Sequence, residues 1–149
     1  MKRLCAFDIE TDRSGEALIS GGWAVDTADP EQPEKGVCDA KHVGDLIEQL
    51  SLANVLVGHN IIDFDLPFLL KRFPAVMPAA VAGKGIIDTL YLSPVAFPRN
   101  PYHHLYKDYK PYPLSQNKPD EDAMAARRLL EDEERVLVDL PGEARSVLM

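Results

Sequence analysis

Four acidic residues have the types and spacing that could hold divalent metal ions: Asp8, Glu10, Asp65 and Asp122. Two of them, Asp8 and Glu10, lie in the stretch FDIETD, at the end of an apolar segment typical of a buried strand. Alternate side chains of a strand share a face about 7 Å apart, so both carboxylates are predicted to project the same way as Leu4 and Ala6. The carboxyl end of a strand is where ligand crevices form in open α/β sheets. Burial of two acids there is costly unless each carboxylate is paired or binds a metal.

The other two acids begin predicted helices. Counting from Asp65, apolar residues fall at i+3, i+4 and i+8, so its side chain leads the stripe that packs on the sheet, whereas the i+4 position of Asp63 is a proline. From Asp122 the i+3, i+4, i+7 and i+8 positions are all Ala or Leu, while Asp120 and Glu121 are predicted to face water. A structural alternative exists for each inward acid, because Asp65 could cap a helix and Asp122 could favour the helix dipole.

Four carboxylates at one sheet edge would repel one another unless divalent cations lay among them. Oxygen-only ligands favour Mg²⁺ or Mn²⁺ over zinc. Two such ions about 4 Å apart form the arrangement that cleaves phosphodiesters, one activating water and the other stabilising the leaving oxygen. The net charge of -8 argues against a phosphate partner bound by protein cations alone. Metal ions would supply the missing positive charge.

The elements that must position these acids are those of an α/β domain. Strands are predicted at 3–9, 17–26 (broken by Gly21 and Gly22), 36–40 and 54–60, with a strand leading into a helical turn at 85–92. Helices are predicted at 42–52, 63–73 and 120–137. The proline-rich segment 93–119 is predicted to be an ordered loop or short helical pieces. Together they predict a mixed central sheet flanked by helices.

Length and composition set the limits of the domain. With 149 residues and 46% hydrophobic residues, the chain is predicted to form one globular unit over 1–135, with 136–149 as a tail or linker. No apolar run approaches the roughly 20 residues that a membrane helix needs. The N-terminus also lacks the pattern of a signal peptide, so the expected location is the cytoplasm, with no membrane partner. Cys5 and Cys38 are expected to be buried thiols.

The ordered set of acidic motifs resembles a known family. FDIET with Asp8 and Glu10, HNIIDFD ending in Asp65, and the dipeptide Asp122–Ala123 are similar to the first, second and third motifs of the DEDD superfamily of 3'-to-5' exonucleases. These enzymes are DnaQ-like and share a ribonuclease H-like fold. The similarity covers about residues 4–131, and IIDTLYL lies between the second and third motifs as is common in the family.

The resemblance implies a role for each matched residue. It implies that two Mg²⁺ or Mn²⁺ ions are held by the four acids, and that Thr11 and Asn60 lie beside the 3' end of a single-stranded nucleic acid. Asp88, in contrast, is expected to support the fold, because aspartates at strand ends often cap the turn that follows.

The chain departs from the family at the general base. The superfamily carries His five residues before the third aspartate or Tyr four residues before it, and here these positions hold Asn117 and Lys118. Asn cannot accept a proton at neutral pH. Either His103 or His104 replaces the base, with His103 preferred, or the metals activate the water without a protein base at a lower rate. A surface role for both histidines is the alternative.

A narrower similarity suggests the substrate. GHNIIDFDLPFL, IDTLYLSP and NKPDEDA resemble exonuclease domains fused to bacterial RecQ-like helicases, in which Asn also occupies the histidine position. This resemblance implies DNA as substrate and a helicase domain or subunit as partner. The tyrosines and lysines of YHHLYKDYKPY suggest either a platform for stacked bases or a loop covering the core. The basic pairs at 71–72 and 127–128 are predicted to be solvated helix faces.

Overall fold

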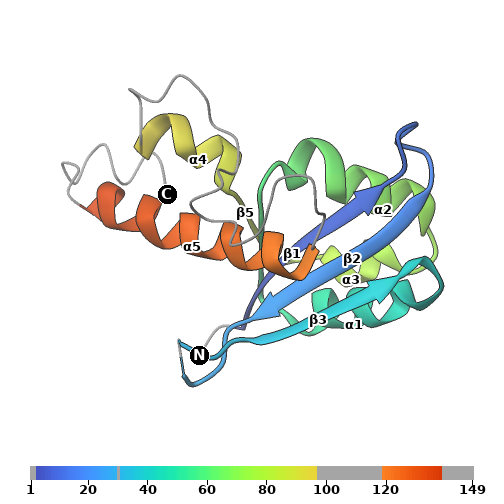
Figure 1. Cartoon of the computed structure of the whole chain (residues 1–149), viewed down its shortest axis with the longest axis horizontal. Coiled ribbons are helices and arrows are strands. Elements are labelled where there is room, and N and C mark those ends of the chain that lie inside the picture. Colours follow the sequence, from blue (N-terminus) through green and yellow to red (C-terminus); the bar gives the residue numbers. More distant parts are fainter. Residues whose placement is uncertain (1–2, 30, 97–118, 139–149) are drawn as a thin grey trace.

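The protein is described by a computed structural model over residues 3–29, 31–96 and 119–138. In this part of the chain, one sheet of five strands has the order β3-β2-β1-β4-β5 (Figure 1). The first three strands are antiparallel neighbours, whereas β4 and β5 run parallel to β1. The strands are β1 Leu4–Thr11, β2 Leu18–Val25, β3 Glu34–Asp39, β4 Val55–Gly58 and β5 Gly85–Asp88.

Helices cover both faces of the sheet. The helical elements are η1 Ala40–His42, α1 Val43–Leu52, η2 Ile61–Asp65, α2 Leu66–Arg72, α3 Met77–Val81, α4 Thr89–Ala96 and α5 Pro119–Val138. On one face, α1, α2 and α3 pack on the larger core, around Phe7, Leu46 and Leu69. On the other face, α5 crosses β1 and β2 (Figure 1) and encloses a smaller core around Ala6, Val57 and Leu130.

The two cores follow from alternation along β1. Cys5, Phe7 and Ile9 point to the larger core, while Leu4 and Ala6 point to the α5 face. Small residues predominate where α5 approaches, since Ala6 and Ala24 of the sheet pack in one cluster with Ala123 of the helix. The side chains of Asp8 and Glu10 therefore belong to the narrow α5 side.

The predicted fold class is confirmed, because the chain is an α/β protein with a mixed sheet of five strands flanked by helices. This architecture is compatible with a ribonuclease H-like fold. Cys5 and Cys38 are buried and free, as expected. Among the described residues, no helix combines the length and apolar character needed to cross a bilayer.

Three details of the predicted elements were wrong. The second strand is not broken at Gly21 and Gly22, because Leu46 and the start of α5 fill the space beside these residues. The second helical region begins at Ile61, with a π-helical turn before α2. The short α3 was not predicted, since five residues give too little periodicity.

Several predictions concern residues outside the described ranges. These are the roles of His103, His104, Asn117 and Lys118, and the platform in YHHLYKDYKPY. Around them, α4 extends to Ala96 and α5 begins at Pro119. The division at residue 135 stays a prediction, and α5 continues past it to Val138.

Candidate metal centre

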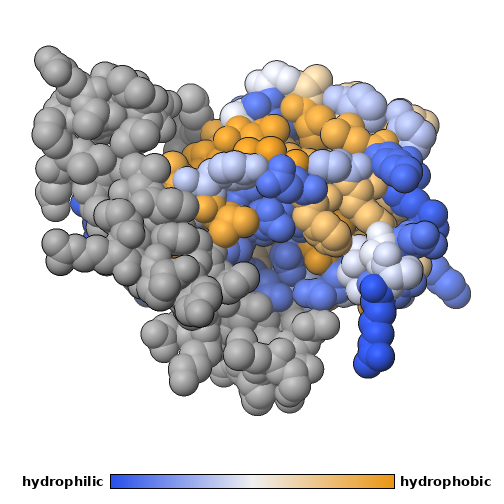
Figure 2. All heavy atoms as spheres, turned by 90° about the horizontal axis from the view of Figure 1, so that it is seen from above, coloured by the Kyte–Doolittle hydropathy of each residue, from blue (hydrophilic) through white to orange (hydrophobic). Residues whose placement is uncertain are grey.

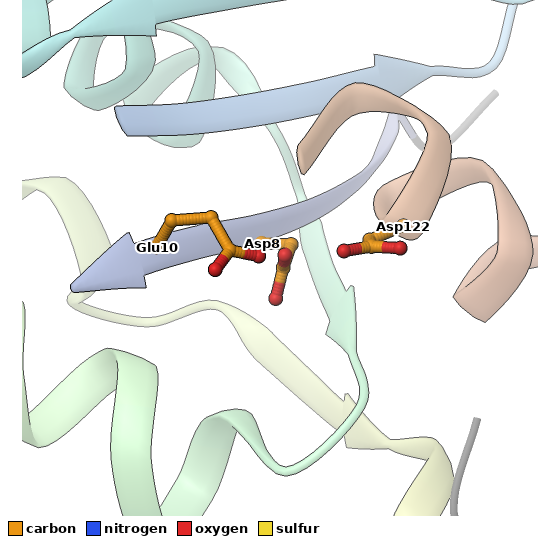
Figure 3. Close-up of side chains that lie close together, drawn as sticks. All are labelled: Asp8, Glu10 and Asp122. Atoms are coloured by element: carbon orange, nitrogen blue, oxygen red, sulfur yellow. The ribbon is translucent and has the colours of Figure 1, made fainter. Parts of the chain in front are cut away.

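Three of the four predicted acids meet at one place. Asp8 and Glu10 come from β1 and Asp122 from the first turn of α5, and one carboxylate oxygen of each lies within 4.8 Å of the others. Figure 3 shows the three side chains directed toward one another across the gap between strand and helix. Residues separated by more than a hundred positions thus form one acidic cluster, Asp8–Glu10–Asp122.

The close approach of α5 to the sheet depends on a glycine. Gly22 of β2 is the register partner of Asp8. A Cβ atom at Gly22 would overlap the backbone of Pro119 and Asp120. The absence of a side chain at this position therefore lets the start of α5 lie against the sheet and brings Asp122 beside Asp8.

The orientation of α5 was predicted correctly for Asp122. The residue is only 6% exposed, and the apolar residues that follow it on the same stripe are buried: Ala125, Ala126, Leu129 and Leu130. Asp120 and Glu121 are partly exposed rather than fully turned to water. Glu121 forms an ion pair of 2.8 Å with Lys35 of β3, which helps to hold the first turn of α5 on the sheet.

Asp65 lies next to this cluster but is not one of its three members. It is 3% exposed, as predicted for an inward acid, whereas Asp63 is exposed. Its Oδ2 accepts a hydrogen bond of 3.0 Å from the backbone N–H of Ile9, between the two acids of β1. The carboxylate of Asp65 is therefore tied to the same stretch of strand as Asp8 and Glu10.

The electrostatics of the site favour protonated acids in the absence of a cation. Burial of its carboxyl raises the pKa of Asp8 well above its usual range, and the charges of Asp65, Asp122 and Glu10 and a hydrogen bond with Asp122 raise it further. Burial likewise raises the pKa of Asp65 to about 8, although hydrogen bonds from backbone N–H groups oppose the shift. The site therefore concentrates negative charge that a bound cation would neutralise.

Asp88 has the structural role that was expected of it. This buried residue at the end of β5 accepts three backbone N–H bonds, from Asn60 at 2.8 Å, Ile62 at 2.9 Å and Leu90 at 3.0 Å. It fixes the turn that leads from β4 into η2. Asn60, which the resemblance places beside the substrate, is held there with a left-handed φ of 66°.

His59 was missed by the sequence analysis. It follows β4 directly, and its Nδ1 lies 2.8 Å from Oγ1 of Thr89, which donates to the carbonyl oxygen of Gly58. Because that hydroxyl has one hydrogen, which it donates to Gly58, Nδ1 of His59 is assigned as the donor in this pair. No local pattern in the sequence marks this residue. Its place follows from the pairing of Ala6 with Val57, because Asp8 and His59 each lie two residues further along the chain from these partners.

The donor set fits a hard divalent cation. All three members of the cluster, and Asp65 beside them, offer carboxylate oxygens, which are the ligands of Mg²⁺ and Mn²⁺. Thr11, the other residue placed by the resemblance, ends β1 just beyond Glu10 and is partly buried. No protein-family model matches the chain, and no curated protein is significantly similar to it.

Proposed function

We propose that this protein is a metal-dependent 3'-to-5' exonuclease of the DEDD type that hydrolyses phosphodiester bonds at single-stranded 3' ends, with DNA as the preferred substrate. The observation that supports the proposal is the meeting of Asp8, Glu10 and Asp122 beside the C-terminal half of the central strand β1, with Asp65 bound to the strand between Asp8 and Glu10. Acids from three distant segments gather around Asp8, and the charges of Asp65, Asp122 and Glu10 raise the cost of ionising it. Such an arrangement is unfavourable for folding and is typical of a functional site.

Each residue has a proposed role in this reaction. Asp8, Glu10, Asp65 and Asp122 would hold two Mg²⁺ or Mn²⁺ ions, which when bound would activate water and stabilise the leaving oxygen. Thr11 and Asn60 would position the 3' end of the strand. The hydrogen bond from Ile9 orients Asp65, and the backbone of Gly22 admits the helix that carries Asp122.

The proton acceptor has two candidates. His103 is the candidate from the sequence, and His59 joins it because its ring is held by Thr89 at the end of the strand next to β1. Replacing each histidine by Gln and measuring the rate against pH separates them. The acceptor is the residue whose loss removes the limb of the profile that reports ionisation of the general base. An unchanged profile in both variants would leave activation by the metals alone.

Activity is tested with end-labelled single-stranded oligonucleotides in the presence of Mn²⁺ or Mg²⁺. We expect stepwise shortening from the 3' end, prevented by EDTA and lost in Asp65→Asn and Asp122→Asn. Two matched controls are Asp63→Asn and Asp120→Asn, which remove neighbouring acids that lie outside the cluster. A folded protein that shortens no strand with any metal or pH would contradict the proposal.

Two alternatives give different results in the same assay. A catalytically silent binding module, which the Asn at position 117 would favour, retains oligonucleotide binding without cleavage and is insensitive to Asp65→Asn. An RNA 3'-end exonuclease prefers RNA when matched DNA and RNA strands compete, because the 2'-OH distinguishes them. A helicase domain or subunit is the partner that the resemblance implies, and the cytoplasm is the location proposed for the reaction.

A further inference from the structure

A cleft lies between the turn after β1 and the end of α2. Its volume is about 340 Å³, and its lining residues are Gly15, Glu16, Phe68, Lys71 and Arg72. The two elements that form it also carry the acids of the candidate site, since β1 contains Asp8 and Glu10 and α2 follows Asp65. Figure 1 shows the turn and α2 lying side by side at one end of the molecule. The cleft therefore lies between the turn that follows β1 and the helix that follows Asp65.

The turn that forms one wall is locally fixed. The carboxylate of Asp12 accepts hydrogen bonds from Ser14 Oγ at 2.6 Å and from the backbone N–H of Glu16 at 3.2 Å. The backbone N–H of Gly15 donates to the carbonyl oxygen of Asp12 at 3.0 Å, and Gly15 has a left-handed φ of 72°. The wall is therefore formed before any ligand arrives.

The cleft contains two of the few cations of this acidic chain. Of the ten lysines and arginines in the described ranges, five are engaged: Lys35 with Glu121, Arg127 with Asp26, Arg135 with Asp132, Arg3 with Gln49, and Lys84 with the carbonyl oxygens of Ser51 and Ala53. Within the described ranges, neither Lys71 nor Arg72 has a carboxylate partner, and the same holds for Arg13 in the turn. Positive charge is thus available at the cleft although the chain carries a net charge of -8.

A second cleft provides an internal comparison. It lies beside α5 and contains Arg127 and Arg128, but the acids Asp26, Glu31 and Glu131 line it too. Arg127 is already bound there to Asp26 at 3.1 Å. That cleft is charge-compensated, whereas the cleft at α2 has two cations and a single acid.

Aromatic surface connects the cleft with the acids. The rings of Phe64 and Phe68 stack with centroids 6.3 Å apart and planes inclined by 23°. Phe64, which precedes Asp65, is 39% exposed, and Ile62 on the same turn is 44% exposed. Figure 2 shows hydrophobic and hydrophilic side chains mixed on the face seen from above. Cations beside aromatic rings are the combination that binds single-stranded nucleic acid.

We propose that this cleft binds the phosphates and a base of the single strand a few nucleotides away from its 3' end, through Lys71, Arg72 and Phe68. This inference rests on the proposed function, which places the 3' end of the strand at the acids. Lys71 and Arg72 follow Asp65 by six and seven residues, which is about 10 Å along a helix. A stacked strand rises about 3.4 Å per nucleotide, so the cleft contacts the strand about three nucleotides from the scissile bond.

The test compares a long substrate with a minimal one. The double variant K71E/R72E is measured against K41E/R128E, which makes the same change in net charge at two exposed cations outside the cleft. We expect K71E/R72E to bind a single-stranded DNA of twelve nucleotides at least about tenfold more weakly than the control in EDTA, by fluorescence anisotropy, because phosphate contacts dominate such affinities. Hydrolysis of the p-nitrophenyl ester of thymidine 5'-monophosphate, which is too short to reach the cleft, should be unchanged.

The salt dependence gives a second readout. In the neutral variant K71A/R72A, loss of two phosphate contacts should reduce the slope of log affinity against log salt by about 1.4. Equal affinity and equal slope in the cleft variants and the control would overturn the inference. Failure of the wild-type protein to hydrolyse either substrate would instead contradict the proposed function, and the binding measurements would still decide whether the cleft recognises the strand. Circular dichroism of each variant confirms that the exposed substitutions leave the fold intact.

Discussion

Two aspartates on the central sheet, Asp8 and Asp88, meet opposite surroundings. The carboxylate of Asp88 accepts three backbone N–H bonds and lies at a turn that it stabilises. The carboxyl of Asp8 instead faces Glu10 and Asp122, and each of these charges raises its pKa further. Both residues are aspartates in the C-terminal half of a strand, yet only Asp88 has backbone N–H donors that compensate for its burial.

This difference indicates that Asp88 stabilises the fold, whereas Asp8 is placed to bind a ligand. A buried carboxylate surrounded by N–H groups is satisfied without further partners. A carboxyl surrounded by other acids lowers the stability of the metal-free protein and becomes favourable only when a cation binds. Substitutions at the two positions should therefore change stability in opposite directions, and only the Asp8 variant should lose its function through the metal.

The largest effect is expected for Asp8→Asn. It should reduce nuclease activity by at least about 100-fold, because even the loss of a residue that only supports a metal ligand commonly costs 10–100-fold. Activity on an end-labelled strand and binding of Mn²⁺ by calorimetry provide the measurements. Activity equal to that of the wild-type protein would remove Asp8 from the site.

The same variant should be more stable than the wild-type protein without metal. The pKa of Asp8 is raised in the folded state, and that of Asp65 is raised to about 8, so their contribution to stability is present below about pH 4 and is lost as the pH rises through the folded pKa values. Thermal unfolding in EDTA from pH 5 to 8 should show a smaller loss of stability in Asp8→Asn. A steeper loss than in the wild-type protein would contradict this account.

Asp88→Asn should give the opposite result. An Asn side chain offers one acceptor oxygen in place of two, and its amino group would face N–H donors at the turn. We expect a loss of about 2–3 kcal/mol in the free energy of unfolding, the usual cost of removing a charged hydrogen-bond partner from buried donors. Urea unfolding at pH 7 measures it, and adding Mn²⁺ should not restore the loss. A stability equal to that of the wild-type protein would show that the turn does not depend on the carboxylate.

Gly22→Ala tests the geometry that brings Asp122 to Asp8. The added methyl group would overlap the backbone at the start of α5, so the helix must move away from the sheet. Overpacking of this kind costs about 1–3 kcal/mol, and we expect a weaker affinity for Mn²⁺ in addition. The matched control is Gly44→Ala, since a Cβ at Gly44 meets no atom within 4 Å. Equal Mn²⁺ affinity in the two variants would show that metal binding does not depend on the absence of a side chain at Gly22.

The sequence predicted the parts of the molecule that depend on local pattern. Alternation in β1 placed Asp8 and Glu10 on one face, and the helical stripe placed Asp65 and Asp122 inward, because burial of apolar neighbours decides these orientations. The unbroken β2 could not be predicted, since the reason that Gly22 stays in the strand is the backbone of a helix about a hundred residues away.

The position of Asp65 relative to the cluster also escaped prediction. A helical stripe shows that an acid points inward, but its partner is a backbone N–H of β1, which lies 56 residues earlier in the chain. His59 escaped for a similar reason, because its neighbours come from pairings between strands. Long-range contacts of this kind leave no periodic signal in the sequence.

Glu133 on α5 is a third buried acid. In the described structure it has neither the backbone N–H donors of Asp88 nor a place in the acidic cluster with Asp8. It lies eleven residues after Asp122 on the same stripe, is 0% exposed, and neither carboxylate oxygen has a hydrogen-bond partner in the described structure. Burial raises its pKa to about 8, with Asp88 as the next cause. The stability that the protonated form provides is therefore present below about pH 4 and is lost as the pH rises through about 8.

Glu133→Gln should consequently stabilise the protein, with an effect that grows from pH 5 to pH 8. We expect about 1–2 kcal/mol at pH 8, less than the full shift implies, because the buried amide of Gln also needs partners. Urea unfolding at pH 5 and pH 8 in EDTA measures the difference, and Glu134→Gln at the neighbouring exposed position is the control. Since Glu133 lies three turns of helix from Asp122, the gain should leave Mn²⁺ affinity unchanged, unlike the gain expected from Asp8→Asn. A change in Mn²⁺ affinity would contradict this account. It would mean that Glu133 influences metal binding, as Asp8 is expected to do.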